Sequence, residues 1–338
     1  MNPLPRIALV ACALAAIAQA QSAPADAYQQ AVAEAADLER QGKLDAGIEK
    51  LKPWVEQFPQ RAEGRHRLGI AFYQQQNYPA AIEHLSAALK LEAEDSPAWR
   101  QSVEHLGLAY YFSHRTTDAS PLLEKALQWK TGDTYLRYAL AMCHVYSHEP
   151  EQARRVFAEL YGIRAESAQA ALLASHFMNR ENFAAEAETL VRQAQGIDPS
   201  LPDLHYRLGV IALTNGDHAE AAQHFREELK RNPLHPMAWH YLGEAQVQSG
   251  ELESAIASLE RAIWLNLRNV PSYLLIAGVY NRRNEYALAE NALQQALSLD
   301  PQNYEARFLL ARIYQKTNRP ELAKQEMARA TQLRKANP

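Results

Sequence analysis

Two histidines stand at a spacing that can present metal ligands. His144 and His148 lie four positions apart, so on a helix both imidazoles would face the same side. A zinc site in a protein needs three or four ligands. No cysteine, third histidine or well-spaced carboxylate completes a site with this pair. We therefore interpret His144 as a core residue and His148 as a turn residue, and we expect no metal site.

Cysteine chemistry is equally limited. The chain has two cysteines, Cys12 and Cys143, and Cys12 falls in an apolar N-terminal segment. If that segment is removed, one thiol remains and no internal disulfide can form. Cys143 is either a reactive thiol or a small buried residue of a helix, and we favour the second interpretation.

The chain also lacks the local patterns that signal an active site. It contains no His-Glu-x-x-His, Cys-x-x-Cys or Gly-x-Ser-x-Gly, and no glycine-rich phosphate loop followed by Lys-Ser/Thr. We predict no catalytic residue and no cofactor, and we predict that the protein is not an enzyme. The net charge of −4 argues against a nucleic-acid partner, whose phosphates require a basic surface.

The first twenty residues predict export. Arg6 is the only charge before the uncharged run Ile7–Ala18, which is shorter than the roughly 20 residues that span a bilayer. Ala18-Gln19-Ala20 has the small-x-small pattern of a signal-peptidase site. We interpret residues 1–20 as a signal peptide and 21–27 as a flexible lead-in, and expect a periplasmic or secreted protein.

Two alternatives keep the protein at a membrane. The N-terminal segment is either cleaved, as above, or retained as an anchor. In addition, Leu9-Val10-Ala11-Cys12 resembles a bacterial lipobox, in which the cysteine is lipidated and starts the mature chain. A lipid at Cys12 would anchor the protein to the envelope.

From residue 28 to residue 337 the chain repeats at an interval of 34 residues. The nine frames are 28–61, 62–95, 100–133, 134–167, 168–201, 202–235, 236–269, 270–303 and 304–337, with an insertion, Ser96–Trp99, after the second. Three positions keep one size class in every frame. The eighth is small: Ala35, Gly69, Gly107, Ala141, Ser175, Gly209, Gly243, Ala277 and Ala311. The twentieth is glycine or alanine: Gly47, Ala81, Ala119, Ala153, Ala187, Ala221, Ala255, Ala289 and Ala323. The twenty-fourth is large and apolar: Leu51, Leu85, Leu123, Phe157, Val191, Phe225, Leu259, Leu293 and Met327.

The clearest frame, 236–269, carries the pattern to which the others conform. Trp239, Leu242-Gly243, Ala255 and Ala262 stand at set offsets, and this pattern resembles the tetratricopeptide repeat of exported bacterial proteins. The resemblance implies an all-α fold, a right-handed α-solenoid of about nine repeats, each an A helix followed by a B helix.

The conserved sizes have a packing explanation. We expect helices A and B to cross most closely at positions 8 and 20, where a methyl group is the largest side chain that fits. We expect the residue at position 24 to fill the space between repeats. Frame 168–201 has Ala174, Ser175 and Met178 in helix A, so its core is thin and predicts a softer joint.

In the family that the chain resembles, partners commonly bind in a concave groove lined by the A helices. Carried onto this sequence, that groove has an aromatic and apolar part followed by a basic part. The predicted lining residues are Leu108, Tyr111, Phe112, Tyr135, Tyr138, Met142, Tyr146, Tyr206, Val210, Arg282, Arg312 and Lys316. The alternative is that several of these side chains pack between successive A helices.

Some members of the family bind a peptide carboxylate with a Lys/Asn/Arg clamp. The positions that would form it hold Tyr206, Val210 and Tyr241 in one place and Leu274, Gly278 and Leu309 in another, so the clamp is absent. The resemblance thus implies a non-enzymatic, exported scaffold that binds a partner protein or peptide in its groove. The alternative is a membrane-associated subunit of envelope, secretion or pilus assembly, held either through a lipid on Cys12 or through a membrane complex. No motif specifies the partner or the oligomeric state.

Overall fold

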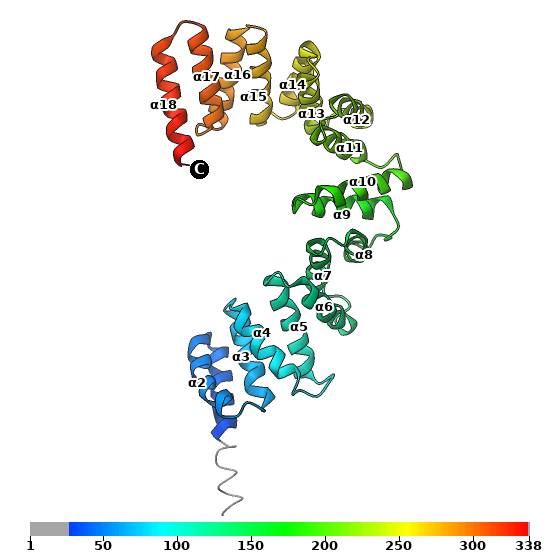
Figure 1. The fold of residues 1–338 in the computed structure, drawn as a ribbon, viewed down its shortest axis with the longest axis vertical. Helices are drawn as coiled ribbons and strands as arrows, with labels where there is room; N and C mark the ends of the chain where they lie inside the picture. Colours follow the sequence, from blue (N-terminus) through cyan, green and yellow to red (C-terminus); the bar gives the residue numbers. More distant parts are fainter. Residues whose placement is uncertain (1–26, 337–338) are drawn as a thin grey trace, which may run out of the picture. The chain divides into compact units, whose positions relative to one another are not determined.

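The computed structural model describes residues 27–336, and within that range every regular element is an α-helix (Figure 1). A helix over 27–40 is followed by α2 (Leu44–Gln57), α3 (Ala62–Gln74), α4 (Tyr78–Leu89), α5 (Pro97–Phe112), α6 (Thr116–Trp129), α7 (Thr134–Tyr146), α8 (Pro150–Tyr161), α9 (Ala168–Arg180), α10 (Ala184–Ile197), α11 (Leu204–Thr214), α12 (His218–Arg231), α13 (Pro236–Gln248), α14 (Leu252–Leu265), α15 (Val270–Arg282), α16 (Tyr286–Leu299), α17 (Tyr304–Lys316) and α18 (Pro320–Ala336). The predicted signal peptide and Cys12 lie outside the described residues. Ala27, which we had assigned to the lead-in, already belongs to the first helix.

Each 34-residue frame holds one A helix and one B helix, and the turn between them has the same geometry throughout. Position 15 of every frame has a positive φ: Gly42, Gln76, His114, His148, Asn182, Gly216, Gly250, Asn284 and Asn318. This left-handed residue ends helix A and reverses the chain. Glycine and asparagine adopt it readily, and these residues are visible in the sequence as breakers. Gln76, His114 and His148 are exposed, and backbone hydrogen bonds hold them in this conformation: the amide of the following residue donates to a helix A carbonyl at 2.9 Å in each case.

The four inserted residues, Ser96–Trp99, form part of a helix. α5 begins at Pro97, and the Ser96 side chain caps it by accepting a hydrogen bond from the Trp99 amide at 3.2 Å. The indole of Trp99 is buried beside Trp129, with ring centroids 5.9 Å apart. The insertion therefore lengthens one A helix and adds an aromatic pair to the core.

Helices A and B of a repeat approach most closely at the glycines of position 8. A methyl group on Gly209 would lie 2.7 Å from Cε1 of Phe225, and one on Gly243 would lie 2.7 Å from Cγ of Leu259. At Gly69 the corresponding distance, to Leu85, is 2.5 Å. Our expectation that a methyl group fits is wrong for these three repeats. The residue at position 24 packs directly on position 8 of its own repeat, and not only between repeats.

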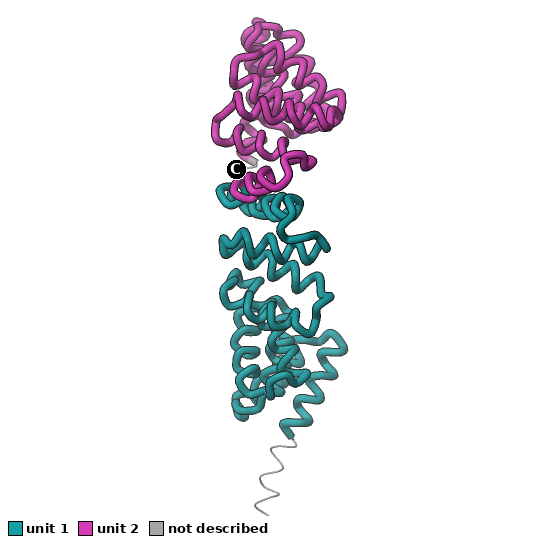
Figure 2. Tube along the Cα trace, turned by 90° about the vertical axis from the view of Figure 1, so that its right-hand side faces the viewer, with its two compact units in different colours: residues 1–187 teal, residues 188–338 magenta. Residues whose placement is uncertain are grey.

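The chain divides into two compact units, residues 1–187 and 188–338 (Figure 2). The division falls within α10, the B helix of the repeat with the thin core. Inside each unit, successive A helices pack on one another as well as on the B helices: α3 on α5, α5 on α7, α11 on α13, α13 on α15 and α15 on α17. Consecutive B helices of the described residues do not pack as closely. The A helices consequently line the inner side of the curvature of each unit.

No helix in the described part of the chain combines the length and the apolar character that a membrane span requires.

Two substitutions of glycine by alanine are expected to have opposite effects on stability, because one glycine packs closely at position 8 and the other does not. Gly209→Ala is expected to lower the free energy of unfolding by about 1–2 kcal/mol, because the added methyl overpacks Phe225 by more than alanine gains in helix propensity. Gly278→Ala, the same change inside α15, meets nothing within 4 Å. It is expected to raise the free energy of unfolding by about 0.5–1 kcal/mol. Thermal or urea unfolding followed by circular dichroism measures both, and shifts of the same sign would contradict the packing.

Candidate functional site

The cysteine and histidines of α7 and the turn after it, which could in principle react or bind a metal, serve packing and turn formation. The Cys143 thiol is fully buried, and burial raises its pKa to about 12, so it stays protonated and unreactive. His144 is buried with its Nδ1 2.6 Å from Glu149. His148 occupies the left-handed turn and its Nδ1 lies 2.6 Å from Glu186. Among residues 27–336, no three histidines, cysteines or carboxylates are grouped so that they could hold a metal ion.

The tertiary structure brings together one serine, histidine and glutamate that the sequence did not predict. Nδ1 of His66 lies 2.8 Å from Ser102 Oγ and 3.0 Å from a Glu92 carboxylate oxygen. A catalytic relay needs the serine and the carboxylate on opposite ring nitrogens. Here both face the same one, and Ser102 is fully buried. The set therefore fastens one repeat to the next and has no nucleophile in reach of a substrate.

The same fastening recurs in the second unit. His240 Nδ1 lies 2.8 Å from Ser272 Oγ, and both side chains are buried. In both cases the histidine stands at position 5 of one repeat and the serine at position 3 of the next. The sequence contains this pairing of a histidine at position 5 with a serine at position 3 of the next repeat in both places. The two residues of each pair are too far apart along the chain to form a recognisable motif.

Aromatic side chains from α3, α5 and α7 meet on the inner face of the first unit. The Tyr73 and Tyr135 hydroxyls are close enough to influence each other's pKa although they belong to the second and fourth repeats. The ring of Tyr73 contacts His105 edge-on at 5.1 Å. Phe112 stacks on Tyr78 at 5.0 Å and contacts Tyr111 at 5.1 Å. We call the set Tyr73, Tyr78, Tyr111, Phe112, Tyr135, Tyr138 and Tyr146 the aromatic face.

Polar groups orient the far end of the aromatic face. The Tyr138 hydroxyl accepts a hydrogen bond from the Arg180 guanidinium at 3.2 Å, and its ring meets Phe157 and Phe177 edge-on. Tyr146 contacts His114 edge-on at 5.7 Å. These contacts fix the rings before any partner binds, so little side-chain entropy remains to be lost on binding.

The aromatic face is uncharged. Burial raises the pKa of Tyr73, Tyr111, Tyr135 and Tyr146 above the usual value for a phenol. All four therefore stay neutral at physiological pH and can donate a hydrogen bond. Tyr135 is 50% exposed, whereas the other members are partly buried.

Two predicted lining residues of the first unit belong to the core. Leu108 is 4% exposed and Met142 is 1% exposed. Leu108 packs with Leu123, Leu136 and Leu140 between two repeats. For these two residues the packing alternative is correct, because a side chain on an A helix that points toward the next repeat is covered by it.

Tyr206 and Val210 are also engaged in packing. The Tyr206 ring stacks on His235 at 4.7 Å and contacts Tyr241 at 6.0 Å, and burial raises its pKa to about 12. Val210 is half-buried against the same cluster around Phe225. The apolar residues that we expected to line the groove in the sixth repeat thus mostly pack against the seventh repeat.

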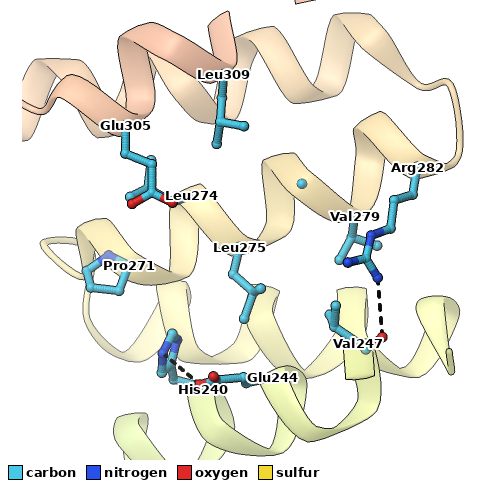
Figure 3. A pocket seen from close by; sticks show the side chains of 11 residues that line it. His240, Glu244, Val247, Pro271, Leu274, Leu275, Val279, Arg282, Glu305 and Leu309 are labelled. Atoms are coloured by element: carbon cyan, nitrogen blue, oxygen red, sulfur yellow. Dashed lines mark hydrogen bonds and ion pairs between the residues drawn. The ribbon is translucent and has the colours of Figure 1, made fainter. Parts of the chain in front are cut away.

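The inner face of the second unit is hollowed between α13, α15 and α17 (Figure 3). The cavity has a volume of 360 Å³, and its walls include Leu274, Leu275 and Leu309. Arg282 borders one side and donates to the Val247 carbonyl at 3.4 Å. The sequence predicted a basic end, but carboxylates also line this cavity, as Figure 3 shows for Glu244 and Glu305.

The other two predicted cations have partners inside the protein. Lys316 Nζ donates to the Asn281 side chain at 2.9 Å, and the Arg312 guanidinium lies 5.9 Å from the Phe308 ring centroid. Both side chains are nevertheless exposed. They can bind an acidic group only in competition with, or in addition to, these contacts.

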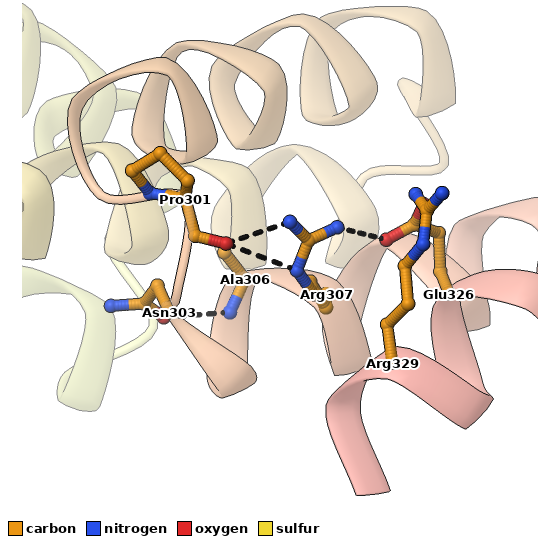
Figure 4. Close-up of polar contacts among 6 residues, drawn as sticks. All are labelled: Pro301, Asn303, Ala306, Arg307, Glu326 and Arg329. Atoms are coloured by element: carbon orange, nitrogen blue, oxygen red, sulfur yellow. Dashed lines mark hydrogen bonds and ion pairs between the residues drawn. The ribbon is translucent and has the colours of Figure 1, made fainter. Parts of the chain in front are cut away.

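A further charged cluster in the last repeat is structural. The carboxylate of Glu326 is nearly buried between the guanidinium groups of Arg307 and Arg329, each at 2.8 Å (Figure 4). Arg307 also donates to the Pro301 carbonyl at 2.7 Å. This network joins α17 to α18 and the preceding loop, so its charges are not free to bind a partner.

Comparison with known proteins gives one consistent result. Models of the tetratricopeptide repeat match residues 32–97, 172–232 and 206–273 in one form and residues 113–175 and 281–338 in another, so that the matches cover most of the chain.

The chain spans between 15% and 38% of the length of three curated relatives that it matches. It is 25% identical to tetratricopeptide repeat protein 37 of Xenopus laevis over 240 residues, covering 68% of this chain and 15% of that protein. It is 24% identical to Superkiller complex protein 3 of Homo sapiens (72% and 16% covered) and 24% identical to Hsp70-Hsp90 organizing protein 2 of Arabidopsis thaliana (65% and 38% covered).

Among solved structures, MamA from Desulfovibrio magneticus RS-1 matches with 20% identity and a TM-score of 0.47, covering 50% of this chain and 96% of that one. The C-terminal part of a repeat-containing protein from Cytophaga hutchinsonii matches with 15% identity and a TM-score of 0.48, covering 68% and 95%.

The buried His240 predicts a stability that depends on pH. Burial lowers the pKa of His240, and the Glu244 carboxylate lies 4.0 Å from its Nε2. Above about pH 6.5 the histidine is neutral in both states. Below that pH the unfolded chain takes up the proton more readily, so stability is lost as the pH falls toward the lower folded pKa.

We therefore expect the melting temperature to fall between pH 7.5 and pH 5.5, and to fall less in His240→Gln. The exposed His114 supplies the control, since His114→Asn should leave the fall unchanged. An equal fall in the wild type and in His240→Gln would show that His240 does not contribute.

Proposed function

We propose, on the premise that this chain belongs to the tetratricopeptide repeat family, that it is a non-enzymatic scaffold that binds a partner protein or peptide on its inner, A-helix surface. Proteins of this family generally mediate protein–protein interactions. Two of the relatives described above have names that denote assembly with other proteins, a complex subunit and an organizing protein.

One observation supports the location of the partner: the aromatic face of the first unit. Tyrosine and tryptophan supply much of the binding energy in protein interfaces, because a large apolar ring is buried at a low cost in entropy. Here most of the rings are already ordered by their mutual contacts, and the half-exposed Tyr135 lies near Tyr73 and Tyr78.

The chemistry of the face favours an apolar, uncharged segment of the partner. Its tyrosines are neutral, and their hydroxyls can donate to the backbone carbonyls of a bound peptide while the rings cover apolar side chains. The cations near the face are already engaged, Arg180 with Tyr138 and Glu181 and Lys130 with Glu104, so a strongly acidic peptide is not favoured here. Acidic groups of the partner would instead meet Arg282, Arg312 and Lys316 in the second unit.

Export is part of the proposal and rests on residues 1–20. A scaffold of this kind would act in the periplasm or outside the cell. The alternative is a membrane-associated subunit of envelope, secretion or pilus assembly, held through a lipid on Cys12 or through a membrane complex. The specific observation in favour of the alternative is the Leu9-Val10-Ala11-Cys12 sequence.

Removing one exposed ring should weaken partner binding. Tyr135→Ala is expected to lower the yield of captured partner by about tenfold in a pull-down from envelope extract, as for a tyrosine at the centre of an interface. Tyr161, which is 55% exposed in the same unit but lies at the end of a B helix, provides the matched control Tyr161→Ala. Equal loss of partners in the two variants, or no loss in either, would refute the assignment to the aromatic face.

Intact-mass measurement of the protein from its native envelope distinguishes the two proposals for its location. Cleavage after Ala20 gives a mature chain that starts at Gln21 and carries no lipid. A mature chain that starts at a diacylated Cys12 would contradict the soluble form and support the lipoprotein.

A further inference from the structure

Large apolar side chains are exposed at one edge of the second unit. Among the large apolar side chains of the described residues, the three with the highest exposed fractions are Leu234, Trp264 and Leu267, at 61%, 64% and 65%. They lie at the C-terminal end of α14 and in the loops that follow α12 and α14. Side chains of this size exposed so far are costly in water unless another surface covers them.

The topology places these three residues at the same edge. Helices α12, α13 and α14 are antiparallel neighbours, so the end of α12, the start of α13 and the end of α14 come together (Figure 1). The loop that carries Leu234 is held to α13 by a hydrogen bond from Trp239 Nε1 to the Pro233 carbonyl at 2.9 Å. In the next loop, the Asn266 side chain accepts from the Arg268 amide at 3.1 Å, which fixes the turn that exposes Leu267.

The opposite edge has a different composition. The turns between helices A and B contain none of the large apolar side chains that are exposed in the described part of the chain. Leu288 and Leu322, in the first turns of α16 and α18, are exposed near that opposite edge, but to a smaller fraction, 49% and 41%. The highest exposure of large apolar side chains is thus found at the B-to-A edge of α12, α13 and α14.

Positive charge surrounds the exposed side chains. The segments 230–235 and 261–269 contain Lys230, Arg231, Arg261 and Arg268 and no carboxylate. The Arg261 guanidinium lies 4.3 Å from the Trp264 ring centroid. Arg268 makes no ion pair with any described residue.

Nearby carboxylates neutralise little of this charge. Glu227 pairs with Lys230 at 2.5 Å, and Glu228 is buried. The Asp203 carboxylate lies 3.8 Å from His235. Glu260, which precedes Arg261, accepts a hydrogen bond from the Tyr280 hydroxyl at 3.2 Å. Arg231 donates to the Pro199 carbonyl at 3.1 Å, so Arg261 and Arg268 are the two arginines that remain available to an anionic partner.

We propose that this edge, residues 230–235 and 261–269, docks on an anionic lipid bilayer. Trp264 and the two leucines would enter the boundary between headgroups and acyl chains, and the arginines would contact lipid phosphates. Tryptophan beside arginine is typical of the membrane interface, since the ring is apolar on its face and polar at its N–H. This edge shares no residue with the aromatic face.

Vesicles with brominated acyl chains test the proposal on the full chain, because bromine quenches only tryptophans that enter the bilayer. Residues 1–20 contain no tryptophan, so quenching cannot come from the apolar N-terminal segment. We expect quenching with phosphatidylglycerol-containing vesicles and little with phosphatidylcholine alone. Trp264→Phe should remove most of the quenching, and Arg261→Gln/Arg268→Gln should weaken binding by about tenfold or more.

Leu288→Ser/Leu322→Ser, at exposed positions on α16 and α18, is the matched control and should leave quenching unchanged. Circular dichroism verifies that each variant is folded. Quenching that persists in Trp264→Phe, or that is equal with neutral vesicles, would overturn the proposal. It would also be overturned if wild type showed no quenching with either vesicle, even if the edge were found to bind an acidic protein.

Discussion

The structure depends on how closely helices A and B of each repeat approach each other. In three repeats the glycine at position 8 lies so near the apolar side chain at position 24 that an added methyl would come within 2.5–2.7 Å of it. This contact sets the distance between the two helices, and the contacts with the next repeat follow from it. Because position 8 is small and position 24 is large and apolar in every repeat, the helix pairs stack in one register and their A helices form a continuous inner surface within each unit.

This stacking buries or engages most of the side chains that could otherwise act as nucleophiles, acids, bases or metal ligands. Cys143 and His144 are buried, and His66 and His240 each fasten one repeat to the next through a serine. A side chain on an A helix has only two environments: it faces the inner surface, or the neighbouring repeat covers it. Leu108 and Met142 are covered, whereas Tyr135 is not. The side chains that the stacking does not cover are available for recognition of a partner. In the first unit these side chains are aromatic.

The two surfaces that we associate with partners differ in physical character. The aromatic face is neutral, inward and ordered by ring contacts, which suits the burial of an apolar peptide segment. The edge around Trp264 is convex, exposed and basic, which suits an extended anionic surface. The aromatic face arises where the A helices meet, and the edge arises where the B helices end. Each of the two surfaces can therefore change in sequence without disturbing the contact at position 8 that holds the repeats together.

The sequence by itself determined the helix pairs, their period and the family, because each repeat is a local unit whose small and large residues recur at fixed offsets. It also indicated the turns at Gly42, Gly216 and Gly250, but not those at Gln76, His114 and His148, where the backbone hydrogen bonds of the helix end hold the left-handed conformation. Only the tertiary structure decided which A-helix residues are open. It brought Tyr135 close to Tyr73, two repeats away, and placed Ser102 within hydrogen-bond distance of His66 in the preceding repeat. Their proximity depends on the stacking of whole repeats, which no local pattern encodes.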